Sequence, residues 1–256
     1  MMFLPQLLAK VAKGEKLAVL TCYDASFARI LARAGVDILL VGDSLGMTVQ
    51  GHATTLAVTL EQTIYHIEAV ARGADKTFIM ADLPFGSYQE GPQQAFASAA
   101  RLLSAGANMV KLEGGAVMCD TVAFLVARGV PVCAHLGLLP QSVNASGYRV
   151  QAKEAAEAQR LLGDALALQA AGAQMLLLEA IPAALARKVG EQLSIPTIGI
   201  GAGPDCTAQV LVLHDILGLT EQPPGFAKNF MLGAAGIEAA VRAYVEAVKN
   251  GQFPVV

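Results

Sequence analysis

Eight short apolar runs, separated by alanine-rich stretches of helical period, constrain the fold of this chain more than any other feature. The runs are almost continuously apolar, which is typical of strands that are buried on both faces of a parallel sheet. They occupy residues 17–23, 37–42, 77–82, 108–113, 130–135, 174–179, 196–201 and 208–214.

The segments between the runs favour helices at 25–34, 60–72, 91–105, 117–127, 154–171, 182–193 and 236–250. Strands that alternate with helices imply βαβ units and a parallel sheet. Eight such units in 256 residues match the size of a (β/α)₈ barrel. We therefore predict an α/β fold, a single TIM-type (β/α)₈ barrel domain over residues 1–256, with a short N-terminal helix and a C-terminal helix. A doubly wound open sheet is the alternative.

The composition excludes several classes of protein. A net charge of −3 gives no basic surface, so we expect no nucleic-acid partner. The 54% hydrophobic and 15% charged residues predict a large core and subunit interfaces. We expect no membrane partner, because no apolar stretch is long enough to span a bilayer. The irregularly spaced cysteines and the lack of a signal-peptide pattern at the start predict a cytoplasmic protein with reduced thiols.

Five of the eight apolar runs end in ionisable residues: Asp43, Asp82, Lys111 with Glu113, His135 and Glu179. The carboxyl ends of all strands in a barrel meet at one rim, where barrel active sites lie. Any one of these acids, taken alone, fits the N-cap of the following helix. A lysine two residues before one of the acids, on the same face of its strand, favours a shared site instead.

Several carboxylates without clustered His or Cys suit a hard divalent cation, above all Mg²⁺. Such a cation can hold a 2-oxo acid and stabilise its enolate. A further carboxylate can then remove the adjacent proton, and a lysine can bind the substrate carboxylate. The residues therefore predict metal-assisted proton abstraction beside a carbonyl, but their spacing leaves open both the substrate and which acid is the base.

Two loops are further candidates for parts of a functional site. The glycine-rich turn at 199–203 lies where barrels often bind phosphate, although close packing of a neighbouring loop also explains its small residues. The polar segment 137–150 is long for a βα loop and predicts a lid over the site, with a plain surface loop as the alternative.

Several longer stretches are more specific: GDSLGMTVQGH (42–52), ADLPFGSY (81–88), NMVKLEGG (108–115), PVCAHLGLLPQSVN (131–144) and LLLEAIP (176–182). Over about residues 17–230 the chain resembles the ketopantoate hydroxymethyltransferase (3-methyl-2-oxobutanoate hydroxymethyltransferase) family. The resemblance implies a (β/α)₈ barrel that uses Mg²⁺ and 5,10-methylenetetrahydrofolate as cosubstrate. It implies hydroxymethyl transfer to the 2-oxo acid 3-methyl-2-oxobutanoate, giving 2-dehydropantoate and tetrahydrofolate in pantothenate (coenzyme A) biosynthesis.

The resemblance also implies residue roles. The family's metal ligands correspond to Asp43, Asp82 and Glu113, and its general base corresponds to Glu179. Its substrate-binding residues correspond to Asp43, Ser44, Asp82, Lys111 and His135. Members of the family are typically cytoplasmic homo-oligomers, in many cases decamers.

The chain departs from the family pattern in two loops. Residues 144–153 are one residue shorter than usual, which bears on the lid, and Cys206-Thr207-Ala208-Gln209 replaces the usual Cys-Asp-Gly-Gln. Neither change touches the expected metal ligands. Two other functions remain open at this point: a Mg²⁺-dependent carbon–carbon lyase or mutase acting on 2-oxo acids, and a catalytically altered protein that still binds 2-oxo acids.

Overall fold

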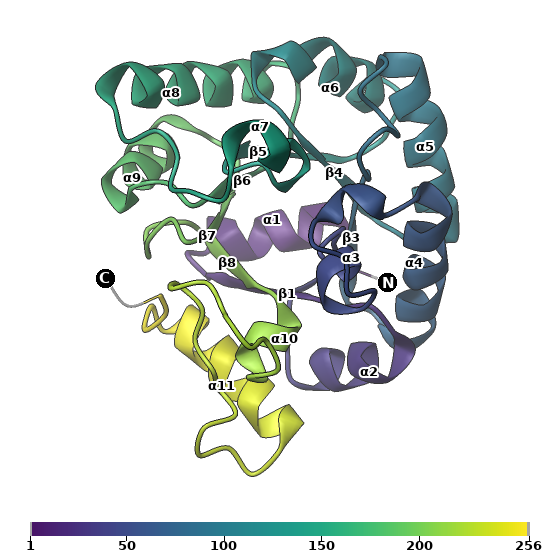
Figure 1. The fold of residues 1–256 in the computed structure, drawn as a ribbon, viewed down its shortest axis with the longest axis vertical. Coiled ribbons are helices and arrows are strands. Elements are labelled where there is room, and N and C mark those ends of the chain that lie inside the picture. The colour runs from purple at the N-terminus through teal and green to yellow at the C-terminus, as the bar shows by residue number, and fades with distance from the viewer. Residues whose placement is uncertain (1, 255–256) are drawn as a thin grey trace.

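The computed structural model describes residues 2–254, which form a closed barrel of eight parallel strands in sequential order, with β8 pairing to β1 (Figure 1). Seven of the eight strands lie within the predicted apolar runs and β5 extends two residues past its run, so the barrel prediction is confirmed and the open sheet is excluded. The strands are β1 (Leu17–Thr21), β2 (Ile38–Val41), β3 (Phe78–Asp82), β4 (Met109–Glu113), β5 (Val132–Gly137), β6 (Met175–Glu179), β7 (Thr197–Ile200) and β8 (Ala208–Leu211).

The longer helices form a layer outside the barrel (Figure 1). They are α2 (Ala25–Arg33), α4 (Leu60–Gly73), α5 (Pro92–Ala105), α6 (Cys119–Val126), α8 (Ala155–Ala170), α9 (Ala183–Gln192) and α11 (Ile237–Lys249). Each falls within a predicted helical segment, to within a residue at its ends. Within residues 2–254, no helix combines the length and the apolar character that a membrane crossing requires.

Short helical elements lie in the connections and were not predicted. They are α3 (Leu45–Thr48), α7 (Val143–Ser146) and α10 (Leu213–Ile216), with 3₁₀ turns at η1 (Thr55–Ala57), η2 (Ala116–Met118) and η3 (Pro140–Ser142). All except η1 follow within a few residues of a strand's carboxyl end.

The barrel interior is a core of its own, separate from the layer between strands and helices. Alternate residues of each strand point inward, as Phe78 and Met80 do in β3 and Met109 does in β4. The same alternation sends Asp82, Lys111 and Glu113 inward, because each lies two or four residues further along its strand. The inner face of these strands is therefore apolar at the amino end and ionisable at the carboxyl end.

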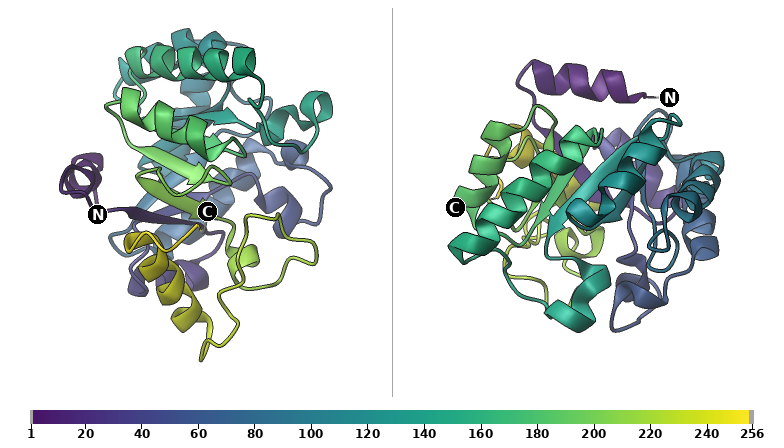
Figure 2. Two further views of the ribbon diagram at one scale, coloured as in Figure 1. Left: turned by 90° about the vertical axis from the view of Figure 1, so that its left-hand side faces the viewer. Right: turned by 90° about the horizontal axis from the view of Figure 1, so that it is seen from above.

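The predicted N-terminal helix is present as α1 (Leu4–Ala12), which lies across one end of the barrel (Figure 2). Its Leu7 is fully buried against the inward-facing side chains. A buried carboxylate, Asp37, fixes this arrangement: it accepts hydrogen bonds from Lys10 Nζ (2.6 Å) and Ala18 N (3.0 Å). Lys249 of α11 also lies 3.3 Å from Asp37 Oδ2, so one side chain joins α1, β1 and α11.

We expect Asp37→Asn to lower the free energy of unfolding by about 1–3 kcal/mol, because charge-assisted hydrogen bonds contribute about that much. Lys10 and Lys249 are each about one-third exposed, so neither is left as a fully buried charge. Urea unfolding monitored by circular dichroism measures the change. Glu61→Gln, which removes the exposed pair with Arg101, is the control and should show no measurable effect. An unchanged midpoint for Asp37→Asn would refute this role.

Candidate active site

The ionisable strand ends converge as expected. Asp43, Ser44, Asp82, Lys111, Glu113, His135 and Glu179 all line one cavity of about 1330 Å³ at the carboxyl ends of the strands. The strand register explains part of this closeness, because Asp82 pairs with Lys111 across β3 and β4, and Glu113 pairs with His135 across β4 and β5. We call Asp43, Asp82 and Glu113 the acid cluster.

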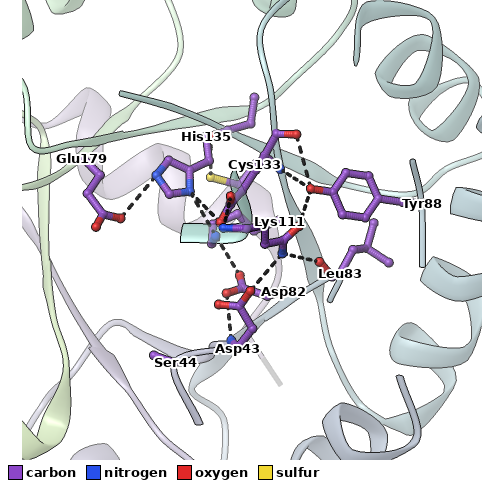
Figure 3. Close-up of polar contacts among 12 residues, drawn as sticks. Asp43, Ser44, Asp82, Leu83, Tyr88, Lys111, Cys133, His135 and Glu179 are labelled. Atoms are coloured by element: carbon purple, nitrogen blue, oxygen red, sulfur yellow. Dashed lines mark hydrogen bonds and ion pairs between the residues drawn. The ribbon is translucent and has the colours of Figure 1, made fainter. Parts of the chain in front are cut away.

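Lys111 lies among these groups (Figure 3), and its ammonium is almost completely buried. Its Nζ lies 3.1 Å from Asp82 Oδ1 and 3.3 Å from His135 Nδ1. Burial alone would lower the pKa of Lys111, but the carboxylates of Asp82, Glu113 and Asp43 outweigh it and raise that pKa. Lys111 therefore stays charged at any physiological pH.

Asp43 follows β2 and is oriented by two neighbours. Its backbone N–H donates to Asp82 Oδ2 (3.1 Å), and its Oδ2 accepts a hydrogen bond from Gln141 Nε2 (2.9 Å). Burial, followed by repulsion from Asp82, raises the pKa of Asp43 to about 7. The adjacent Ser44 shares a 2.8 Å hydrogen bond with the hydroxyl of the buried Tyr23.

His135 is fully buried between Lys111 and Glu179 (Figure 3). Burial, reinforced by the charge of Lys111, lowers the pKa of His135 well below its usual value, so the ring is neutral. Because an ammonium can only donate, the contact with Lys111 makes Nδ1 the acceptor and leaves the ring proton on Nε2. That nitrogen faces Glu179 Oε2 at 3.4 Å.

Glu179, the last residue of β6, is more exposed than the acid cluster, while its raised pKa resembles that of Asp43. Its side chain is 16% exposed, against 3–4% for Asp82 and Glu113, so it is the carboxylate most open to the cavity. Burial raises its pKa to about 7, and Lys111 only partly offsets that effect. A carboxylate with a pKa close to neutrality has the basicity that a general base requires.

The acid cluster has the chemistry of a site for a hard cation. It offers oxygen donors only, and its carboxylates exceed the single lysine in charge. Asp82 Oδ1 and Glu113 Oε1 are buried without a hydrogen-bond partner, although Lys111 lies near the first. Burial raises the pKa of Glu113, which a bound cation would reverse. Within the described chain, however, no three His, Cys, Asp or Glu side chains are already gathered around one point, because the acids face Lys111 and Gln141.

Two buried residues at this site did not emerge from the sequence as functional. Gln141, in η3, contacts both Asp43 and Glu113. The Tyr88 hydroxyl donates to Gln141 Oε1 (2.7 Å) and accepts from the backbone N–H of Glu113 (3.1 Å). Neither residue follows a strand directly, so the strand-end pattern could not select them.

The loops around the cavity fill out the sequence expectations. At the glycine-rich turn, Gly201 adopts a positive φ of 59°, and the ring of Phe226 occupies the space that a Cβ would need. Close packing of a neighbouring loop thus accounts for this glycine. Tyr148, Arg149 and Val150, in the segment considered as a lid, line the cavity. The altered stretch at 206–209 packs locally, where Gln209 Nε2 donates to Gly203 O.

Comparison with known proteins decides the family. The model of the ketopantoate hydroxymethyltransferase family matches residues 2–255. The chain belongs to the ketopantoate hydroxymethyltransferase family. It is therefore an enzyme of the transferase class.

Relatives named 3-methyl-2-oxobutanoate hydroxymethyltransferase match this family member over nearly its whole length. The protein of Thiobacillus denitrificans is 65% identical over 243 residues, which cover 94% of this chain and 93% of the relative. That of Nitrosospira multiformis is 62% identical, covering 94% of this chain and 92% of the relative.

Solved structures show the same fold at low identity. Phosphonopyruvate hydrolase in complex with oxalate and Mg²⁺ superposes with a TM-score of 0.65 at 14% identity, over 85% of this chain and 83% of that one. Phosphoenolpyruvate phosphomutase from Streptomyces platensis subsp. rosaceus gives the same TM-score at 16% identity and the same two coverages. These likenesses concern the barrel alone.

The raised pKa of Glu179 has a consequence for stability. Between its ordinary value of 4.5 and about 7, the native carboxyl holds a proton that the unfolded one has lost. The penalty for ionising it in the fold is therefore absent below pH 4.5 and complete above about 7. With chelator present, we expect Glu179→Gln to exceed the parent in stability at pH 8 by on the order of 2 kcal/mol, and to match it near pH 4.5.

Urea unfolding at both pH values measures this difference. Glu157→Gln, on the exposed side of α8, is the matched control for the loss of one carboxylate. A pH-independent difference for Glu179→Gln would contradict the assigned environment.

Proposed function

We propose that this enzyme transfers a hydroxymethyl group from 5,10-methylenetetrahydrofolate to 3-methyl-2-oxobutanoate, giving 2-dehydropantoate and tetrahydrofolate in pantothenate biosynthesis. The observation that carries the proposal is the acid cluster around Lys111 with Glu179 on the other side of His135, in a member of this family. The name shared by relatives that are 60–65% identical supports the same reaction.

Asp43, Asp82 and Glu113 are the residues that would hold a divalent cation, of which Mg²⁺ best suits their oxygen donors. When bound there, the cation would polarise the keto group and stabilise the enolate of the substrate. The surplus of carboxylates over the single Lys111 ammonium in a buried site supports this assignment.

Lys111 and Ser44 bind the 2-oxo acid in this proposal. The Lys111 ammonium is held in place by Asp82 and His135, so it offers a fixed positive charge to the substrate carboxylate. Ser44 lines the cavity beside Asp43, and its Oγ is held by the hydrogen bond that it shares with the Tyr23 hydroxyl. Asp82 and His135 contribute by positioning Lys111.

Glu179 acts as the general base that removes the proton from C3 of the substrate. Its carboxylate is the most exposed of the four, and its pKa of about 7 matches that task. Nε2 of the neutral His135 faces Glu179 Oε2 at 3.4 Å without a formed hydrogen bond, so the carboxylate stays free to take up the proton. The carbanion equivalent then forms the new carbon–carbon bond to the one-carbon unit, both carbon–nitrogen bonds of that unit to the folate break, and water supplies the hydroxyl oxygen. The substrate proton and one water proton go to the two folate nitrogens, which gives tetrahydrofolate.

The cavity has room for a second, larger substrate. Its volume of about 1330 Å³ exceeds what a five-carbon acid needs. Arg149 and Lys228 line it away from the acid cluster, and their positive charges suit the carboxylates of a folate tail. Phe226 and Tyr148 supply apolar and aromatic surface for the rings.

The lyase or mutase alternative has the support of the fold alone, since the solved structures are only 14–18% identical to this chain. Activity without folate would distinguish it.

We further propose a cytoplasmic homo-oligomer, such as a decamer. Large apolar side chains that stay exposed, among them Val117 (87%) and Leu232 (80%), support subunit contacts.

The proposed reaction makes a prediction about the general base. Incubating 3-methyl-2-oxobutanoate with the enzyme and Mg²⁺ in D₂O should remove the C3–H signal from the proton NMR spectrum. The hydroxymethyl product should appear only when methylenetetrahydrofolate is added. We expect Glu179→Gln to reduce the exchange rate at least about 100-fold, the lower range for loss of a general base, while Mn²⁺ binding stays intact. Glu157→Gln is the control, and retained exchange in Glu179→Gln would refute the base assignment.

A second prediction concerns Lys111. We expect Lys111→Met, which keeps the length of the side chain, to weaken binding of the 2-oxo acid by about 10- to 100-fold, the effect of one charge-assisted hydrogen bond. Isothermal titration with 3-methyl-2-oxobutanoate at saturating Mg²⁺ measures it. Lys228→Met, which removes a charge from the other part of the cavity, should leave this affinity unchanged. Equal losses in both variants would contradict the division of the cavity.

A further inference from the structure

Gln141 makes more polar contacts than any residue so far assigned a role. It lies in η3, in the loop that follows β5, and is 5% exposed. Its Nε2 donates to Asp43 Oδ2 and to Leu83 O, both at 2.9 Å. Its Oε1 accepts hydrogen bonds from the Tyr88 hydroxyl (2.7 Å) and from Gln89 Nε2 (3.2 Å).

These contacts fix the amide in one orientation. If the amide were flipped, its oxygen would face the Asp43 carboxylate and the Leu83 carbonyl, which are both acceptors. Both N–H groups and the oxygen of the side chain are thus satisfied in a single arrangement. Because the residue is buried, changing that arrangement would leave polar groups without partners.

The backbone of Gln141 reaches a second acid. Its N–H donates to Glu113 Oε2 (3.0 Å), while Glu113 Oε1 stays buried without a partner. One residue therefore holds one oxygen each of Asp43, which follows β2, and Glu113, which ends β4, on opposite sides of the strand that carries Asp82. Tyr88, which lies away from Glu179 in Figure 3, reinforces the arrangement by contacting both Gln141 and the Glu113 backbone.

We propose that Gln141 is a positioning residue for the cation site. It would orient Asp43 and Glu113 so that the second oxygen of each points toward the ion. The inference rests on the proposed cation site and adds to it a residue with no charge and no contact with the ion. Hydrogen bonds to metal-binding carboxylates typically change metal affinity by about 10- to 100-fold.

Gln141→Met tests the proposal, because it preserves the chain length and the backbone N–H to Glu113 but removes every side-chain hydrogen bond. We expect Mn²⁺ affinity to fall by about 10- to 100-fold. Loss of the free-ion signal in electron paramagnetic resonance measures binding of Mn²⁺ alone, without substrate. We also expect a changed spectrum for the bound ion, a readout that a purely structural role would not move. Gln89→Met, which removes the longest hydrogen bond to Gln141 and two contacts to its own loop backbone, is the matched control and should bind Mn²⁺ like the parent.

Tyr88→Phe keeps the test decisive if Gln141→Met unfolds. It removes no contact to either carboxylate, but it frees Gln141 Oε1 from its shortest hydrogen bond and the Glu113 backbone N–H from the Tyr88 hydroxyl, so affinity should fall in the same direction by a smaller factor. Cooperative urea unfolding in chelator confirms that each variant is folded. Parent-like affinity and spectrum in folded Gln141→Met or Tyr88→Phe would overturn the proposal.

Asp82→Asn distinguishes a misplaced cation site from a wrong role for Gln141. It removes an expected ligand that Gln141 does not touch. If Asp82→Asn leaves Mn²⁺ affinity unchanged, the cation site itself is misplaced, and the inference fails with it. If Asp82→Asn weakens binding while Gln141→Met does not, the cation site stands and only the positioning role is wrong.

Discussion

The burial of one ammonium among several carboxylates is the constraint on which the rest of this site depends. Lys111 lies 3.1 Å from Asp82, and each has at most 5% of its side chain exposed. A buried ion pair is tolerated only where geometry and further hydrogen bonds offset the loss of solvent. Burial raises the pKa values of Asp43 and Glu179 to about 7, and the single Lys111 ammonium only partly offsets that effect. The site is therefore poised to accept more positive charge.

The barrel confines this charge to one end. Inward-facing positions near the amino ends of the strands carry apolar side chains such as Val19, Phe78 and Met109, and α1 covers that end with Leu7. Water is thus excluded below the acid cluster, which is why desolvation is the largest influence on every raised carboxyl pKa in the site. The apolar side chains and the reactive carboxyls therefore occupy opposite ends of the same inward-facing strand positions.

The sequence was enough to predict the barrel, because strands buried on both faces have an apolar pattern that few other elements share. It was also enough to bring the strand-end residues together, since parallel strands share a rim. The sequence did not predict a role for Gln141 or Tyr88, and the reason is physical. Their roles depend on where two loops return to the barrel, and hydrogen bonds such as that between Gln141 and Asp43 join residues 98 positions apart. The roles of the individual acids came from the family resemblance, because spacing does not distinguish a ligand from a base.

The structure does contain a distinction between the acids, and it concerns their neighbours rather than their type. Glu113 is held by the backbone of Gln141 and lies beside the Tyr88 network, whereas Glu179 meets only the weakly placed Nε2 of His135 at 3.4 Å. A carboxylate fixed by donors suits a constant role such as ligation, while one that is loosely held and partly exposed can take up and release a proton.

The loop after β5 carries Gln141 and therefore supplies the donor that fixes the Glu113 carboxylate. Its shortened part begins at residue 144, beyond Gln141 and the buried Val143, so the departure from the family pattern falls on the part of the loop whose residues 148–150 line the cavity. Variation in that part can therefore change the cavity wall while the acids keep their arrangement.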